Sequence, residues 1–221
     1  GGQLAPGARG AIASQNAGES TAPCRSRQYG AGGKRDQGTC GGAVSVFSIA
    51  QPSAIVIGNL FVVDGEQEHR GVELSFYGEP APGLRVLGGA TVLNAERERT
   101  QDGAFDGKTA IGVPERQANL NLEYDLPALP GLSLDGRLVY TGKQFANETN
   151  TLELDAWTRL DLGARYSLDV SGKPVTLRAR IENVTDENDW LSAGGYPGAN
   201  HLALGAPRTL TVSAPVDFSS V

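Results

Sequence analysis

Apolar and polar side chains alternate along most of this 221-residue sequence. In one segment, Val72, Leu74 and Phe76 share one face of an extended chain, and Glu73 and Ser75 share the other. The same two-residue period returns in 119–126, 132–141, 159–168, 175–182 and 209–218. Alternation of this kind is typical of β-strands with one apolar and one polar face. The pattern therefore predicts an all-β protein.

The predicted strands are longer than those of most soluble proteins. Nine are expected, at about 25–34, 43–50, 67–78, 84–97, 114–125, 132–143, 156–169, 174–187 and 207–218. Soluble strands usually have about five or six residues, whereas a tilted strand needs about nine to eleven to cross a bilayer. Outer-membrane barrels turn an apolar face to lipid and a polar face to a wet lumen. Length and alternation together predict an antiparallel, up-and-down β-barrel segment of the outer-membrane type.

The connections between these strands fall into two kinds. Short turns rich in Pro and Gly are expected at 35–42, 78–84, 125–132 and 169–174, and long polar loops at about 51–67, 98–113, 143–155 and 188–206. Regular exchange of short turns and long loops is the layout of an up-and-down outer-membrane barrel. Single-chain bacterial barrels have an even number of strands, and nine are predicted here. The sequence therefore predicts a part of a larger barrel.

The low hydrophobic content suits either a loop-rich protein or a barrel with a wet inner face. Hydrophobic residues make up 39% of the sequence, and the formal net charge is −6. Lys and Arg are scattered, which excludes a basic nucleic-acid surface. The charge run at 96–99 is expected to be solvated, as charged side chains usually are. A Gly/Ala/Ser-rich tract at 1–22 is predicted to be flexible, and 23–221 to form the barrel portion.

No motif in the sequence identifies an enzyme or a cofactor site. The GxSxG, HExxH, P-loop and GxGxxG patterns do not occur. The two cysteines, Cys24 and Cys40, leave two alternatives open: one disulfide in an oxidising compartment, or two free thiols. They do not suggest a metal site, because no CxxC motif or His pair accompanies them. No catalytic residue, metal ligand or cofactor is therefore predicted.

Four short motifs resemble those of a known family. They are RGVEL at 70–74, GVP at 112–114, ENVTDENDW at 182–190 and LGAPRTL at 204–210. Their order and spacing resemble the C-terminal part of TonB-dependent ferric-siderophore receptors of the bacterial outer membrane. The resemblance implies a barrel of about 22 strands with an N-terminal plug, energised from the inner membrane, that takes up iron chelates. A chain of this length is then expected to be a barrel fragment that lacks the plug.

The resemblance also implies partners for the chain. These are a ferric siderophore, outer-membrane lipid and the barrel-assembly machinery, which in this family reads a terminal aromatic residue. Here Phe218 is followed by three further residues. In addition, Pro215 removes a hydrogen-bond donor from the last predicted strand. Both departures predict less efficient assembly into the membrane.

Aromatic and basic side chains are the candidate ligand contacts. Trp190, Tyr196 and His201 lie in the last long loop, and Phe145 flanks another. In the resembled family, extracellular loops, the barrel wall and the plug contact the siderophore. Exposed aromatics in loops hold organic ligands, but aromatics also form belts at the bilayer edge, so both interpretations stay open.

Arginines on the predicted polar faces form a second candidate group. Its members are Arg137, Arg159, Arg165, Arg178 and Arg180. Such side chains either attract anionic ferric chelates through the lumen or pair with its Asp and Glu residues. Of this group, Arg159 and Arg178 are the predicted ligand contacts.

Two functional hypotheses of different classes follow, beside a third in which the fragment has no activity of its own. The first is an outer-membrane receptor for ferric-siderophore uptake, represented here by a part of its barrel. The second is a free-standing, soluble β protein derived from a receptor, with binding or hydrolytic, esterase-like activity of its own. The long amphipathic strands favour the first hypothesis, and no residue pattern nominates a catalytic group for the second.

Overall fold

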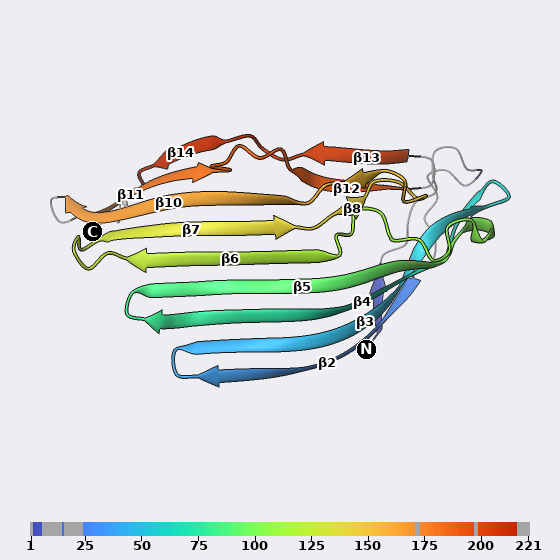
Figure 1. The fold of residues 1–221 in the computed structure, drawn as a ribbon, viewed down its shortest axis with the longest axis horizontal. Coiled ribbons are helices and arrows are strands. Elements are labelled where there is room, and N and C mark those ends of the chain that lie inside the picture. The colour runs from blue at the N-terminus through green and yellow to red at the C-terminus, as the bar shows by residue number, and fades with distance from the viewer. Residues whose placement is uncertain (1, 6–14, 16–23, 171–172, 197–198, 216–221) are drawn as a thin grey trace.

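The chain forms one long antiparallel sheet in a computed structural model, which describes residues 2–5, 15, 24–170, 173–196 and 199–215. Each strand pairs with its neighbours in chain order across the sheet (Figure 1). The strands are β1 (Gly2–Ala5), β2 (Cys24–Gln37), β3 (Cys40–Ile57), β4 (Leu60–Ala81), β5 (Leu84–Arg99), β6 (Arg116–Asp125), β7 (Leu132–Thr141), β10 (Trp157–Val170), β11 (Lys173–Glu182) and β14 (Thr209–Ser213). The all-β, up-and-down prediction is confirmed.

All nine predicted strands are present, as β2 to β7, β10, β11 and β14. A tenth strand, β1, pairs with the start of β2 and lies inside the tract predicted to be flexible. The rest of that tract, apart from residue 15, falls outside the described residues. The two edge strands, β1 and β14, are not paired with each other in the described part of the chain, so the sheet is open.

The loop predicted at 51–67 is wrong. Strands β3 and β4 continue through this region and meet at a tight turn formed by Gly58 and Asn59. Both turn residues have positive φ angles, 53° and 73°, as the turns favoured in two-residue hairpins require. β-Branched and aromatic residues flank the turn on both sides, and the pairing passes a register shift between Ser53 and Ile55. The hairpin therefore projects beyond its neighbours.

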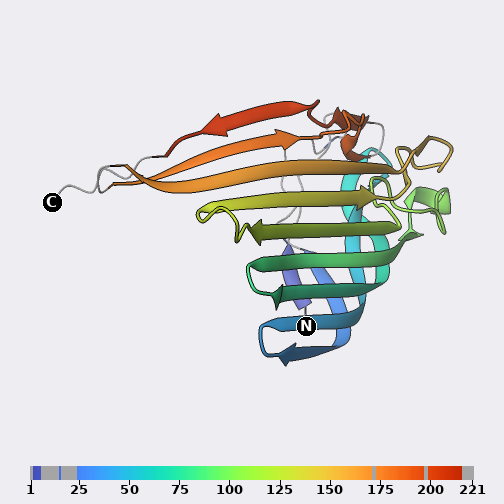
Figure 2. The ribbon, with the colours of Figure 1, turned by 60° about the vertical axis from the view of Figure 1, so that its left-hand side comes forward.

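The four predicted short turns lie at one end of the sheet, and the long connections lie at the other end together with the β3–β4 hairpin turn (Figure 1). The other three predicted long loops remain long and carry small elements of their own. These are the 3-10 turn η1 (Gln101–Gly103), the pair β8 (Gln144–Phe145) and β9 (Glu153–Leu154), and the hairpin β12 (Trp190–Tyr196) and β13 (Ala199–Leu204). Figure 2 shows these elements gathered at one end of the long strands.

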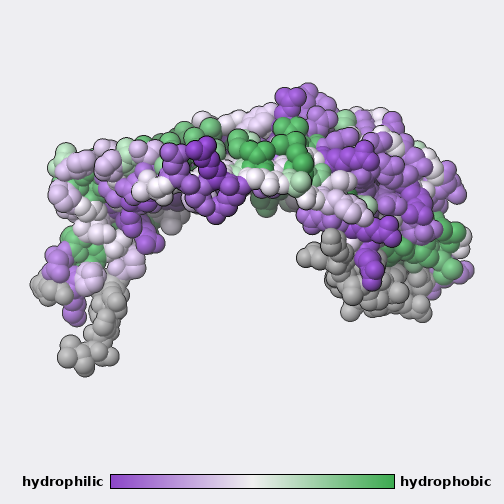
Figure 3. Space-filling model, turned by 90° about the horizontal axis from the view of Figure 1, so that it is seen from below, coloured by the Kyte–Doolittle hydropathy of each residue, from purple (hydrophilic) through white to green (hydrophobic). Residues whose placement is uncertain are grey.

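The two faces of the sheet differ sharply in chemistry. Large apolar side chains on one face are between about a third and three quarters exposed, among them Val72, Leu74, Leu122, Leu134, Leu138, Leu162 and Leu210. The described residues contain few buried hydrophobic side chains, and most of these lie near the long connections. Figure 3 shows the sheet as an arch with a hollow underside. The apolar face therefore covers no packed interior within the described residues.

Glycines opposite aromatic rings help to hold the register of the central strands. Gly71 pairs with Phe47, and a Cβ at Gly71 would lie 2.7 Å from Cζ of that ring. On the other face, the ring of Phe76 lies over Gly88. An aromatic ring covering a strand glycine replaces the missing side-chain contacts. This close approach explains the glycine of the RGVEL motif. Within the described residues, no helix has the length and apolar character needed to cross a membrane.

Candidate functional site

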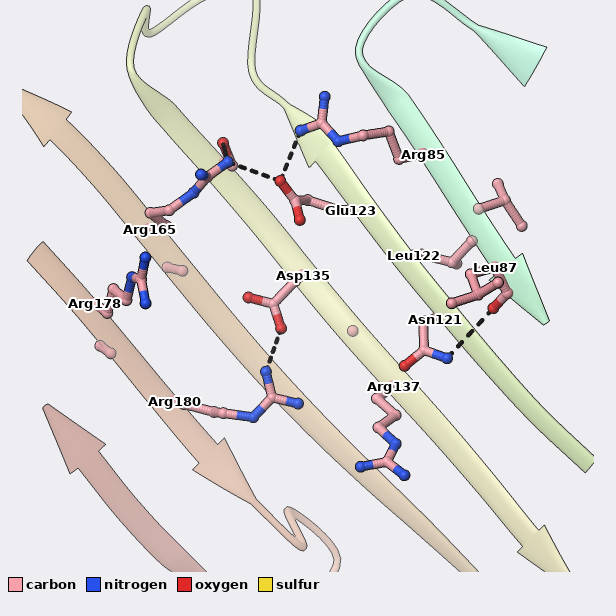
Figure 4. Close-up of a pocket in the computed structure, with 15 residues that line it drawn as sticks. Arg85, Leu87, Asn121, Leu122, Glu123, Asp135, Arg137, Arg165, Arg178 and Arg180 are labelled. Atoms are coloured by element: carbon pink, nitrogen blue, oxygen red, sulfur yellow. Dashed lines mark hydrogen bonds and ion pairs between the residues drawn. The ribbon is translucent and has the colours of Figure 1, made fainter. Parts of the chain in front are cut away.

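A groove of about 580 Å³ lies on the polar face of strands β5, β6, β7, β10 and β11 (Figure 4). Because side chains alternate between faces, every second residue of these strands points into it. Its polar lining is Arg85, Asn121, Glu123, Ser133, Asp135, Arg137, Arg165, Arg178 and Arg180. A volume of this size lies in the range of small-molecule sites.

Carboxylates in the groove join several strands of the sheet, including β6 and β10, which are separated by β7. Glu123 on β6 accepts hydrogen bonds from Arg85 on β5 at 2.7 Å and from Arg165 on β10 at 2.8 Å. At the edge of the groove, Asp125 receives both terminal nitrogens of Arg85, at 2.7 and 2.8 Å. The hydroxyl of Ser133 also donates to Asp125, at 2.6 Å. Charge-assisted and bidentate bonds of this kind hold a fixed geometry.

A glycine permits an ion pair to cross a whole strand. Gly163 on β10 lies in register between Asp135 on β7 and Arg180 on β11. Nη1 of Arg180 donates to Oδ2 of Asp135 at 2.6 Å, over the space that a side chain at Gly163 would occupy. A Cβ at Gly163 would overlap the Asp135 carboxylate. The lack of a side chain at Gly163 thus permits a polar contact between β7 and β11, which are not neighbouring strands.

The lining of the groove carries an excess of positive charge. Five arginines and two carboxylates contribute a formal charge of 5 − 2 = +3. Arg85, Arg165 and Arg180 are paired, as described above. By contrast, Arg137 and Arg178 have no hydrogen bond or ion pair within the part of the chain that the structure describes. Two guanidinium groups in the groove are therefore available to an anion.

Of the two predicted arginine contacts, Arg178 lines this groove and Arg159 does not. Nε and Nη2 of Arg159 donate to the two carboxylate oxygens of Asp161 at 2.9 and 3.2 Å. Asp161 is almost fully buried, 1% exposed, and also accepts the backbone N–H of Asn183 at 2.8 Å. A buried carboxylate needs such partners, because leaving it unpaired is costly. Arg159 is therefore committed to an internal ion pair.

The ENVTDENDW motif forms a compact, hydrogen-bonded turn at the end of β11. Asn183 is 1% exposed and adopts a positive φ of 53°. Its Nδ2 donates to the carbonyl of Glu187 at 2.8 Å and to that of Ala206 at 3.2 Å, and its Oδ1 accepts the N–H of Glu187 at 2.8 Å. Asp186 in turn accepts the N–H of Arg208 at 2.9 Å. The motif therefore ties β11 to the LGAPRTL segment that leads into β14.

The predicted aromatic contacts lie at the long-connection end, away from the groove. Trp190 opens β12 and is half-buried, Phe145 in β8 is half-buried, and His201 in β13 is exposed. The side chain of Tyr196 falls outside the described residues. Gly112 of the GVP motif joins two of these loops, because its N–H donates to the carbonyl of Phe145 at 2.9 Å while its Cα approaches the carbonyl of Ala193.

The charge run at 96–99 is not fully solvated, contrary to expectation. Arg97 is 6% exposed, and its Nη2 donates to Glu148 of the 143–155 loop at 2.9 Å. Its guanidinium also lies 5.4 Å from the ring centroid of Phe105. Nearby, the exposed Lys143 donates to Glu153 at 2.7 Å, and this hydrogen bond raises the pKa of the ammonium group. Sequence reasoning missed these loop contacts, because residues 51 positions apart in the sequence carry no local signal.

The two cysteines lie far apart. Cys24 opens β2, and Cys40 pairs with Gln37 at the other end of that 14-residue strand. Such a strand is about 45 Å long, whereas a disulfide requires Cα atoms within about 7 Å. A disulfide between them is excluded by this geometry, and Cys40 is a free thiol. Among the described residues, no group of three His, Cys, Asp or Glu side chains is arranged to hold a metal ion.

Comparison with known proteins identifies the family of this chain. Residues 3–184 match the family described as TonB dependent receptor-like, beta-barrel. The chain belongs to this family. The family is one of receptors of the bacterial outer membrane.

Individual relatives support the assignment. The ferrichrome receptor FcuA of Yersinia enterocolitica is 40% identical over 205 residues, which are 92% of this chain and 27% of that receptor. The ferrichrome outer membrane transporter/phage receptor of Escherichia coli K12 is 30% identical over 168 residues, 73% of this chain and 21% of that protein. The crystal structure of BauA, the ferric preacinetobactin receptor of Acinetobacter baumannii, superimposes with a TM-score of 0.80 and 41% identity over 97% of this chain and 33% of BauA. The chain thus spans between a fifth and a third of the length of these relatives.

Proposed function

We propose that this chain forms part of the barrel wall of an outer-membrane receptor that takes up ferric siderophores. The observation that carries the proposal is the contrast between its two faces. One face exposes Leu, Val and Tyr side chains, and the other carries a network of ion pairs around an open groove. Lipid on one side and water on the other suit this arrangement. The named ligands of the relatives, ferrichrome and ferric preacinetobactin, support iron chelates as the proposed substrate class.

The long connections are the proposed ligand-contacting end. Trp190, Tyr196, His201 and Phe145 belong to these connections, and Gly112 holds two of them in contact. Aromatic side chains bind organic chelates through large, rigid apolar surfaces. Arg178 and Arg159 lie along the polar face below them, where Arg178 is free to meet an anion and Arg159 holds Asp161. Outer-membrane lipid against the apolar face and the barrel-assembly machinery complete the proposed partners.

Membrane fractionation tests where the chain resides. The 221-residue chain is expressed in a Gram-negative host, and the outer-membrane fraction is washed with alkaline carbonate. A chain whose apolar face meets lipid stays in the pellet and is released by detergent, because exposed apolar area is favourable only in hydrocarbon. A compact, monodisperse protein in the aqueous fraction would contradict the receptor proposal and favour a free-standing soluble protein.

Ligand binding is tested with ferrichrome and ferric preacinetobactin on the detergent-extracted chain. Trp190→Ala is expected to weaken binding about tenfold or more, since large aromatic contacts dominate such sites. Leu191→Ala is the matched control, because Leu191 is the neighbouring residue of β12 and is 71% exposed. Equal effects of the two substitutions, or no binding of either chelate by the unaltered chain, would count against the proposed site. Isothermal titration calorimetry measures both affinities.

A further inference from the structure

Three long connections lie together at one end of the sheet (Figure 2). They are residues 100–115 between β5 and β6, 142–156 between β7 and β10, and 183–208 between β11 and β14. Two of them carry candidate ligand contacts, Phe145 in the second connection and Trp190 in the third. A ligand that touches both rings requires the two connections to keep a fixed separation. The contacts between connections therefore decide how far the site is formed before a ligand binds.

The first connection is fixed to the sheet. The carbonyl of Lys108 accepts the N–H of Arg97 at 2.9 Å. The N–H of Ala110 donates to the carbonyl of Ala95, also at 2.9 Å. This segment therefore runs antiparallel to β5 as a short extension of the sheet. Backbone groups of successive residues in a strand point to alternate sides, so the N–H and carbonyl of Thr109 point away from β5.

The side chain of Asn150, in the second connection, binds both of these backbone groups. Its Oδ1 accepts the N–H of Thr109 at 2.8 Å, and its Nδ2 donates to the carbonyl of Thr109 at 3.0 Å. An amide side chain offers an acceptor and a donor side by side, as the backbone of a neighbouring strand does. The φ angle of Asn150 is 57°, which asparagine adopts more readily than most residues. Asn150 thus joins the second connection to the first.

Gly112 joins all three connections. Its N–H donates to the carbonyl of Phe145 in the second connection at 2.9 Å. A Cβ at Gly112 would collide with the carbonyl oxygen of Ala193, which lies in the same strand as Trp190. Its φ angle of 71° also favours glycine. Both candidate aromatic contacts therefore sit on segments that Gly112 holds against the first connection.

We propose that Asn150 and Gly112 are positioning residues for the ligand, which join the three connections into one rigid unit and hold Phe145 and Trp190 at a fixed separation. The inference rests on the proposed function, because positioning has a meaning only if these rings contact a ligand. A preformed site loses less conformational freedom on binding than independently moving connections do. Affinity falls in proportion to the fraction of molecules in which the connections are joined.

Substitution of Asn150 tests the first junction. Asn150→Gly tolerates the positive φ angle and removes the amide. In the ligand-free chain in detergent, the N–H of Gly112 is expected to exchange with solvent about tenfold or more faster, because two hydrogen bonds between the connections are lost. The affinity for ferrichrome or ferric preacinetobactin is expected to fall about threefold or more. NMR measures the exchange, and isothermal titration calorimetry measures the affinity.

Thr149→Gly is the matched control for this variant. It places the same residue type one position earlier, and the Thr149 hydroxyl is bonded within its own connection, to Thr151 at 2.9 Å. Exchange at Gly112 and the affinity are expected to change less than about twofold. A saturating chelate is expected to restore slow exchange at Gly112 in Asn150→Gly, since coupling between ligand and junction is reciprocal. A junction that serves stability alone would show no such recovery.

Gly112→Ala tests the second junction. Its methyl group displaces β12 and is expected to weaken chelate binding about tenfold or more. Gly107→Ala is the matched control, because Gly107 has a similar φ angle of 75° and its Cβ would meet only Glu96 Oε1, at 3.6 Å, among the described residues. It carries the same backbone strain without the collision, so an affinity change below about twofold is expected. If Gly112→Ala does not fold, Asn150→Gly, which adds no atom, still tests the inference.

Unchanged exchange at Gly112 in Asn150→Gly would overturn the junction. Faster exchange with unchanged affinity would overturn the positioning role, and so would equal losses of affinity in the control variants. Failure of this inference is distinguishable from failure of the proposed function. An unaltered chain that binds neither chelate refutes the proposed function, whereas equal binding by the unaltered chain and by both junction variants refutes only the inference.

Discussion

Replacement of Asn183 by alanine tests how much the hydrogen-bonded turn at the end of β11 stabilises the fold. The side chain makes three hydrogen bonds, to the carbonyls of Glu187 and Ala206 and from the N–H of Glu187, and it is 1% exposed. A buried hydrogen bond contributes about 1 kcal/mol net, so three contribute about 3 kcal/mol. Alanine also tolerates the positive φ of 53° less well than asparagine does, at a cost of up to about 1 kcal/mol. The expected loss of unfolding free energy is therefore about 3 to 4 kcal/mol.

Denaturant unfolding of the detergent-solubilised chain, followed by the fluorescence of the nearby Trp190, measures this loss. Asn183→Gly separates the two contributions, because glycine accepts the backbone conformation but lacks the hydrogen bonds. Asn188→Ala is the matched control: the same change in the same motif at an exposed position, with an expected effect below about 0.5 kcal/mol. A loss below about 1 kcal/mol in Asn183→Ala, or one equal to that of the control, would refute the reasoning.

Three further changes test other parts of the structure. Gly163→Ala places a Cβ against the carboxylate of the ion pair that crosses β10 and is expected to lower the free energy of unfolding by about 1 to 2 kcal/mol. In the control Gly136→Ala on β7, the new Cβ meets Leu162 only at 3.5 Å, so little loss is expected. Thermal unfolding compares the two variants. Arg97→Met removes the buried partner of the 143–155 loop, so limited proteolysis is expected to cleave that loop faster, and unchanged cleavage rates would contradict the interpretation. Leu138→Arg places a charge on the apolar face, which costs about 2 to 4 kcal/mol near the bilayer midplane and is expected to reduce membrane partitioning. Asn121→Arg makes a comparable change on the polar face and is expected to leave membrane partitioning unaltered. Equal partitioning of both variants would argue against a lipid-facing surface.

Local alternation was sufficient to predict the strands and their two faces. A period of two places Leu120, Leu122 and Tyr124 on one face whatever the strand pairs with, and the same holds for its neighbours. The short turns at 78–84 and 125–132 were predictable for a related reason, since Pro and Gly set the backbone angles that turns need. The hairpin around Gly58 was missed because the polar and Pro-containing stretches at 51–53 and 64–67 resemble a loop, although both sides pair in the structure.

The candidate site was only partly predictable. The sequence identified Arg137, Arg159, Arg165, Arg178 and Arg180 as polar-face residues, and Arg159 and Arg178 were the predicted ligand contacts, but it did not show which arginines pair with carboxylates. Pairing depends on which residues the register places side by side, and registers join positions that are distant in the chain. Thus Arg159 is committed to a buried Asp161, while Arg178 is free. The predicted aromatic contacts lie at the long-connection end, and whether they bind a ligand stays a prediction.

An alternating sequence specifies extended segments with an apolar face and a polar face, because the geometry of a single strand decides to which face each side chain points. The motifs along this sequence also sufficed to indicate TonB-dependent receptors, and the family match over residues 3–184 confirms this prediction. Only the alignment of five strands decides which arginines pair with carboxylates and which do not. The same alignment leaves the space above Gly163 open for the Asp135–Arg180 ion pair. Ion pairs across a sheet depend on distances between strands, and those distances exist only after folding.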